Sequence, residues 1–160
     1  MKKGMVIIMK NTKQAIFQLG DESYGLDIME VNTIEKFITV EQVSNSPKNM
    51  KGIIRLRGDI IPVYSLRRKF GLEDKEPDDE SRYIITTSNE VLMAYEVDKM
   101  QGIVQMEPGQ QSEVPSIVKS KDTSYMKSVT NINGHLVILL NHDGLLSEEE
   151  QSKIKAIIKK

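Results

Sequence analysis

The stretch KGIIRLRGDIIPVYSLRRKFGL, residues 51–72, is the part of the chain around which we expect the fold to be organised. Two apolar runs, residues 53–56 and 60–64, flank the sequence Arg-Gly-Asp. Gly58 accepts a positive φ without a Cβ clash, so Gly58 followed by Asp59 suits the two central positions of a tight turn. The pattern predicts a β-hairpin of two antiparallel strands.

A short helix is expected directly after this hairpin. Pro62 lacks a backbone donor, which predicts that the second strand lies at a sheet edge or stops pairing there. Ser65 is a good N-cap residue, and Gly71 can end a helix. Because Leu66 and Phe70 lie four residues apart, one apolar face of these one or two turns can pack on the hairpin.

The composition excludes several classes of protein. The 160 residues suit one compact domain or two small ones that share a core. Lysine and arginine number 22 and aspartate and glutamate 23, so the net charge gives no reason to expect nucleic acid or an anionic membrane as the main partner. The absence of cysteine excludes disulfides, thiolate catalysis and cysteine-based metal sites.

No segment has the pattern of a membrane span or a leader. The longest apolar run near the start, residues 5–9, is too short for the core of a signal peptide. Nothing approaches the roughly 20 apolar residues that cross a bilayer. We therefore expect a soluble, cytosolic protein.

Short strands and turns are expected before the central stretch. Residues 12–19 and 24–28 alternate between apolar and polar side chains, which predicts a first hairpin. Apolar residues spaced three apart predict a helical turn at 30–35, before another strand at 38–43. Residues 46–52 begin with a Ser-Pro pair and end with a glycine, which is typical of one more helical turn.

The later half of the chain also predicts strands, followed by one helix. The acidic run at 73–80 lacks the spacing of a calcium loop, so we expect a solvated connection. Asn133-Gly134 is the strongest short hairpin signal in the chain. Ser147 and Glu150 form a capping box at the start of a C-terminal helix. The expected strands are 82–87, 91–97, 102–106, 126–132 and 135–140, and a loop is expected at 107–121.

Residues 52–72 resemble the signature of the CheW family, the small adaptors of bacterial chemotaxis. The usual form of that signature is roughly G-V-I-N-L-R-G-x-I-I-P-V-I-D-L-R-x-x-F-G-L, and here the chain has GIIRLRGDIIPVYSLRRKFGL. LGDESYGLDI at 19–28 and NGHLVILLNHDGLL at 133–146 are also similar to family motifs. Arg55 stands where the family usually has Asn, and Ser65 and Asn141 stand where it usually has Asp.

The strand pattern predicts an all-β chain of barrels or a sandwich. The resemblance, which covers residues 12–146, implies two five-stranded SH3-like β-barrels side by side, with short helical turns and a C-terminal α-helix. On this interpretation residues 1–160 form one CheW-like domain. One barrel is built from 12–20 plus 83–146, the other is built from 21–82, and the helix at 148–159 lies against the body.

Arg57 is the strongest candidate for a binding residue. It lies at the end of the predicted hairpin, and its planar guanidinium offers five donors to a carboxylate or to backbone carbonyls. A local ion pair with Asp59 is the alternative that composition alone would favour. The resemblance reverses that preference, because the family carries Arg at this position and uses the region to couple to receptors.

Three further residues are expected to bind the receptor because of the resemblance. Gly52 corresponds to a glycine of the family signature, and Val31 matches the family segment D-I-x-x-V near the receptor-binding groove. The family commonly has Glu where this chain has Thr33, and Glu35 is close enough to replace it.

The resemblance implies a non-enzymatic adaptor that couples transmembrane chemoreceptors to the histidine kinase CheA. The cytoplasmic tip of a receptor coiled coil is expected in an apolar groove, and the regulatory domain of the kinase at an exposed barrel edge whose residues the sequence does not identify. The expected location is the cytoplasm, at the inner face of the membrane through receptor arrays. No catalytic residue, cofactor, nucleic-acid partner or direct membrane insertion is expected.

An oligonucleotide-binding β-barrel is the alternative function. The basic run at 67–69 could contact phosphate, although it lies opposite the apolar face of the expected helix. The three Phe and five Tyr do not cluster with the basic residues, as a stacking platform for bases requires. His135 and His142 are the only histidines and form no H-E-x-x-H pattern, so no metal site is expected.

Overall fold

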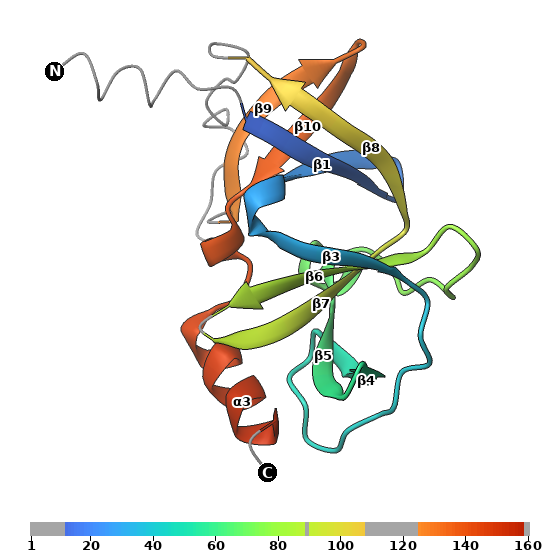
Figure 1. Cartoon of the computed structure of the whole chain (residues 1–160), viewed down its shortest axis with the longest axis vertical. Coiled ribbons are helices and arrows are strands. Elements are labelled where there is room, and N and C mark those ends of the chain that lie inside the picture. Colours follow the sequence, from blue (N-terminus) through green and yellow to red (C-terminus); the bar gives the residue numbers. More distant parts are fainter. Residues whose placement is uncertain (1–11, 89, 108–124, 159–160) are drawn as a thin grey trace, which may run out of the picture.

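The computed structural model describes residues 12–88, 90–107 and 125–158, which form two five-stranded sheets (Figure 1). The first sheet has the order β8-β1-β2-β10-β9, with strands Lys99–Met106, Thr12–Leu19, Glu22–Asp27, His135–Leu140 and Met126–Ile132. The second has the order β3-β6-β7-β5-β4, with strands Val31–Lys36, Arg82–Ser88, Val91–Val97, Asp59–Ser65 and Met50–Leu56. The predicted all-β class with two five-stranded units is confirmed.

The two units are open SH3-like sheets rather than fully closed barrels. Each has a linear strand order, and the described strands do not join its two edges by a continuous ladder. In the second sheet an isolated bridge between Glu41 and Ile53 connects the segment after β3 to β4, the strand at the opposite edge. The second unit is therefore closed at one point.

The strands are distributed between the units differently from the expected division. β2 belongs to the first sheet, although residues 21–82 are expected in the other unit. β6 and β7 belong to the second sheet, although residues 83–146 are expected in the first unit. A tight turn explains the first difference, because Gly20 and Asp21 join β1 directly to β2 and keep both strands in one sheet. The second difference comes from strand pairing, because β6 pairs with β3 and β7 pairs with β5.

The turn of the β4–β5 hairpin is centred one residue earlier than expected. Arg57 has a φ of 50° and Gly58 a φ of 87°, while Asp59 already pairs with Leu56. Two positive φ values at the centre are typical of a type I′ turn, whose twist matches that of the flanking strands. The predicted hairpin is confirmed, but Arg57 rather than Asp59 shares its centre with Gly58.

Several predictions around this hairpin are wrong. β5 is not an edge strand, since it lies between β7 and β4 and pairs with both. The helical turn lies at Ile28–Glu30 (η1), and residues 31–36 form β3, where a register shift between Val31 and Thr33 produces the helix-like apolar spacing. Residues 38–43 contribute one bridge instead of a strand. Of residues 46–52, a turn closed by the Met50 N–H on the Pro47 carbonyl leads into β4, which begins at Met50.

Both predicted helices are confirmed. The helix α2, Leu66–Lys69, is capped by Ser65, whose hydroxyl accepts a hydrogen bond from the Arg68 N–H. Gly71, with a φ of 80°, and Leu72 donate to carbonyls of the helix in a Schellman arrangement. At Glu148–Ile158 (α3), Ser147 and Glu150 make the two reciprocal hydrogen bonds of a capping box, each 3.1 Å long.

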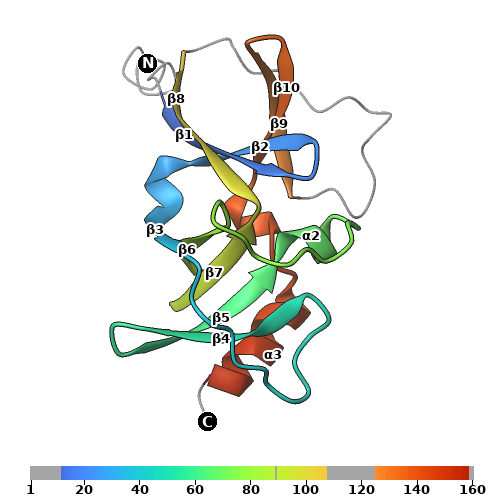
Figure 2. The same ribbon diagram turned by 90° about the vertical axis from the view of Figure 1, so that its right-hand side faces the viewer.

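The largest apolar cluster contains side chains from both sheets. Its members include Phe17, Leu19, Tyr24 and Leu26 from the first sheet and Tyr64, Ile84, Met93, Tyr95 and Val97 from the second. Figure 2 shows α2 between the two sheets, and Phe70 at its end stacks on Tyr24 with ring centroids 5.0 Å apart. The sheets therefore share one core.

Asp98 joins the two sheets at the point where the chain crosses from β7 to β8. Its carboxylate accepts hydrogen bonds from Arg67 of α2, at 2.9 and 2.7 Å, and from the backbone N–H of Gly20 in the turn between β1 and β2, at 2.8 Å. Burial alone would raise the pKa of Asp98, but the Arg67 guanidinium and the Gly20 N–H outweigh it, so this pKa lies below its ordinary value.

Replacing this carboxylate tests its contribution to stability and its pH dependence. Because the folded-state pKa of Asp98 is lowered, its contribution is present above about pH 4 and is lost as the pH falls through the folded value. Asp98→Asn should lower the free energy of unfolding at pH 7 by about 1 kcal/mol after allowance for solvent screening. Urea unfolding should show a smaller difference from wild type at pH 3; an equal difference at both pH values would contradict the ionic role.

Candidate functional site

Arg57 is held at the tip of the β4–β5 hairpin in a conformation that arginine rarely adopts. Its φ of 50° lies in the left-handed region, which favours glycine or asparagine. The corresponding position of the β9–β10 hairpin has Asn133, with a φ of 52°, also before a glycine. Strained backbone at an exposed turn is typical of residues that are retained for binding.

The guanidinium of Arg57 is available to a partner. Its side chain is 68% exposed and donates from Nη1 to Glu35 Oε2 at 3.2 Å. Glu35 lies on β3 and is only 17% exposed, so it contacts Arg57 from the protein side. A single exposed contact of this kind holds the arginine weakly and leaves most of its donors for a carboxylate or for carbonyl groups. The ion pair with Asp59 considered from composition is replaced by one with Glu35.

Gly52 lies inside β4 and beneath the segment that follows β3. Its φ is 151°, and a Cβ built on it would overlap the carbonyl oxygen of Glu41 and lie 2.8 Å from Val40 Cγ1. Gly52 is buried, and the atoms that lie against it belong to Val40 and Glu41 of the same chain. Only glycine has both the backbone freedom and the space that this close approach requires.

Val31 lies at the other end of β3 from Glu35. It is half-buried, pairs with Thr86 of β6 and packs against the apolar cluster between the sheets. Of the predicted site residues, Glu35 and Arg57 are in direct contact. Gly52 lies against the end of the segment 35–41, which begins at Glu35. Val31 lies four residues away along the same strand.

Sequence reasoning missed two features near these residues. Arg55 and Glu41 form an exposed ion pair with an Nε to Oε2 distance of 2.7 Å, and the hydrogen bond from Arg55 lowers the pKa of Glu41. The sequence marks Arg55 as a departure from the family. Its ion-pair partner Glu41 lies 14 residues away, and no periodic pattern in the sequence indicates that the two residues pair. Met29 on η1 is 87% exposed. The sequence does not indicate this exposure, because an apolar residue at that position suggests the interior of a strand.

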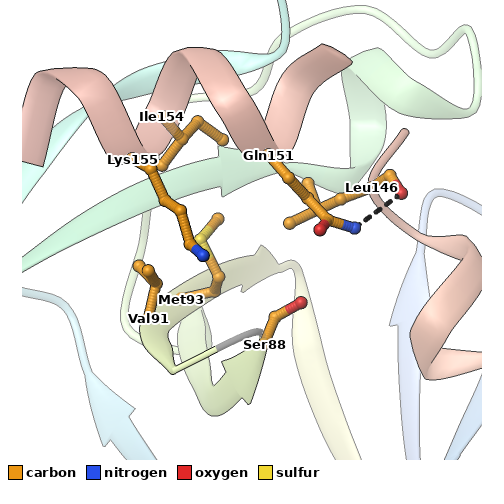
Figure 3. Close-up of a pocket in the computed structure, with 7 residues that line it drawn as sticks. All are labelled: Ser88, Val91, Met93, Leu146, Gln151, Ile154 and Lys155. Carbon is orange, nitrogen blue, oxygen red and sulfur yellow. Dashed lines mark hydrogen bonds between the residues drawn. The ribbon is translucent and has the colours of Figure 1, made fainter. Parts of the chain in front are cut away.

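The described residues contain no cavity with the features of an active site. The pocket beneath α3 in Figure 3, between Ile154 and Met93, has a volume of about 10 Å³, which is room for no more than one water. A hollow of about 400 Å³ lies on the first sheet, where Ser23 and Gln18 hydrogen-bond to Gln101. No group of three or more metal-ligating side chains occurs in residues 12–88, 90–107 and 125–158.

The basic run on α2 is engaged within the protein rather than solvated. Arg67 pairs with Asp98, Arg68 with Asp74 at 2.9 Å, and Lys69 lies 4.0 Å from Glu150. These contacts leave no positively charged groove there for phosphates, which the oligonucleotide-binding alternative requires. Separately, none of the helices in the described residues is long and apolar enough to span a membrane.

The turn conformation of Arg57 leads to a prediction about stability. Arg57→Asn should raise the free energy of unfolding by about 0.5 kcal/mol, because asparagine adopts the left-handed conformation more readily and the lost ion pair is exposed and weak. Asn133→Arg, the matched exchange in the other hairpin, should lower it by a similar amount. Chemical denaturation measures both; a loss of more than about 1 kcal/mol in Arg57→Asn would mean that the Glu35 pair stabilises the fold.

Comparison with known proteins confirms the family suggested by the signature. A family model described as a CheW-like domain matches residues 14–150. The chemotaxis protein CheW of Klebsiella aerogenes is 28% identical over 144 residues, which cover 90% of this chain and 87% of that protein. The chemotaxis protein CheW of Helicobacter pylori is 26% identical over 133 residues, which cover 83% and 80%. The crystal structure of the scaffolding protein TtCheW from Thermoanaerobacter tengcongensis matches with a TM-score of 0.79 and 26% identity, over 88% of this chain and 91% of that one. The chain therefore belongs to the family of CheW-like domains.

Proposed function

We propose that the protein is a non-enzymatic adaptor of chemotaxis that couples chemoreceptors to the histidine kinase CheA. Membership of the CheW-like family supports an adaptor rather than an enzyme, and the oligonucleotide-binding alternative is not favoured. The proposed location is the inner face of the membrane, reached through the receptors. Association with membrane-anchored partners needs no membrane-spanning helix in the adaptor itself.

The receptor site in this proposal centres on Arg57. The observation that carries it is an arginine held at positive φ on an exposed turn, with one weak internal partner, Glu35. A carboxylate from the tip of a receptor could bind the remaining guanidinium donors in the bidentate geometry that arginine favours. At the other end of β3 from Glu35, the exposed side chain of Met29 and the half-buried Val31 offer apolar contact.

The kinase contact in this proposal lies elsewhere on the molecule. An adaptor must hold both partners at once, so the surfaces that they occupy cannot overlap. Small transient signalling interfaces bury on the order of 1,200 Å² or less in total. Several weak contacts of this size become stable when receptors, adaptors and kinases assemble into an array, because each contact raises the local concentration of the others.

Backbone amide shifts of the labelled protein test the two-sided adaptor. A fragment containing the receptor's cytoplasmic hairpin should shift Val31, Glu35 and Arg57, and the kinase regulatory domain should shift a different set. Arg57→Asn should weaken receptor binding about tenfold, or about 1.4 kcal/mol, with no change in kinase binding. Lys153→Ala, which removes an exposed charge on α3, serves as the control and should change neither affinity.

Two results would count against this function. If neither fragment binds, the adaptor role is overturned. If a single-stranded oligonucleotide then binds at low salt and shifts residues 67–69, the oligonucleotide-binding alternative replaces it.

A further inference from the structure

Residues 37–43, which we call the strap, cross from the end of β3 to β4. The N–H of Glu41 donates to the Ile53 carbonyl and the N–H of Ile53 donates to the Glu41 carbonyl, both at 2.8 Å. β3 and β4 are the two edges of the second sheet, so the strap joins edges that the strand ladder leaves apart. In Figure 2 it passes alongside the β4–β5 hairpin.

Apolar contacts also hold the strap in place. Ile38 and Val40 pack against the smaller apolar cluster of the second sheet, and the hydroxyl of Tyr83 donates to the Ile38 carbonyl at 3.1 Å. That cluster consists of Ile54, Ile61, Val63, Tyr83, Ile85 and Ala94. The strap therefore covers one side of the hairpin that carries Arg57.

Besides the burial of Ile54 and Ile61 in that cluster, the turn end of this hairpin has few other backbone attachments. β5 pairs with β7 at residues 63–65, after Pro62, which has no N–H to donate. Nearer the turn, the strap supplies the backbone bond at Ile53, and Gly52 lets the Glu41 carbonyl approach closely enough to make it. The position of Arg57 relative to β3 therefore depends on the strap.

Two ion pairs link the same two segments. Glu35 on β3 pairs with Arg57, and Glu41 on the strap pairs with Arg55, so both acids come from one side and both arginines from the hairpin. Arg55 uses Nε and Nη2 toward the two carboxylate oxygens of Glu41, at 2.7 and 3.5 Å. This contact adds a side-chain attachment at the residue whose backbone already bridges to β4.

We propose that Glu41 is a positioning residue for receptor binding: with Arg55, and seated on Gly52, it fixes the strap and thereby the spacing between β3 and Arg57. This inference rests on the proposed receptor site. It assigns Gly52 an indirect role, because Gly52 acts by seating the strap and not by touching the receptor. It also gives a function to Arg55, which departs from the usual family residue.

A charge exchange separates positioning from direct contact. Glu41→Arg places two arginines together and should loosen the strap, which should weaken binding of the receptor fragment about threefold to fivefold. Hydrogen exchange at the amides of Glu41 and Ile53 should accelerate in parallel, since these amides form the bridge. The double variant Glu41→Arg/Arg55→Glu restores an opposite-charge pair, and should return both affinity and exchange to within about twofold of wild type.

A second variant tests the seat of the strap. Gly52→Ala should accelerate exchange at Glu41 and Ile53 and weaken receptor binding about tenfold, because its Cβ displaces the Glu41 carbonyl. Circular dichroism should show that both sheets remain folded. Kinase binding should stay unchanged in every variant.

The outcomes distinguish this inference from the receptor site on which it rests. If Arg57→Asn weakens receptor binding but Glu41→Arg does not, Arg57 binds the receptor without help from the strap and the inference is wrong. If the double variant binds as weakly as Glu41→Arg, the two charges touch the receptor directly, which also overturns it. If wild type does not bind the receptor fragment, the proposed function fails first and the inference fails with it.

Discussion

The apolar layer between the two sheets is the constraint on which the rest of the molecule depends. A five-stranded sheet with one apolar face is stable only when another layer covers that face, and here each sheet covers the other. Phe17 and Leu19 on one face of β1 meet this layer, whereas Ile16 on the opposite face packs in a separate small cluster with Val137 and Leu139. The chain crosses between the sheets at η1 and again at Asp98, and at Asp98 a partly buried ionic contact accompanies the crossing.

Apart from Val31, which packs against this layer, the candidate site lies away from it, on β3 and the β4–β5 hairpin. The β4–β5 hairpin pairs with β7 only at residues 63–65, away from its turn, and with the strap on the other side. Exposed ion pairs are weak, so a charged side chain can exchange its internal partner for a group on a bound protein. Buried apolar contacts do not exchange in this way. In the proposed receptor site this separation would let Arg57 exchange Glu35 for a receptor group without cost to the core. On the same proposal, Gly52 and Glu41 would restrict where the hairpin can move.

Individual residues show how far the sequence predicts this architecture. Ser65 and Gly71 act on their nearest neighbours along the chain, and the helix between them forms as expected. Asn133-Gly134 and the capping box at Ser147 are equally local and equally well predicted. The helical turn expected at 30–35 fails because a register shift in β3 imitates helical spacing, and that shift exists only through pairing with β6. Arg57 is predicted to bind from the family signature, and Glu35 only as a replacement for the glutamate that the family has at Thr33; their contact with each other is not predicted.

The sequence by itself determined the turns, the caps, the alternation of the strands and the family, because each of these depends on residues close together along the chain. Only the tertiary structure decided which sheet receives β2, β6 and β7, and that the strap crosses to β4. It also decided that the basic residues of α2 form ion pairs with Asp98, Asp74 and Glu150. These outcomes depend on contacts between segments far apart in sequence, where many pairings satisfy the same local pattern and the packing of the whole molecule selects one.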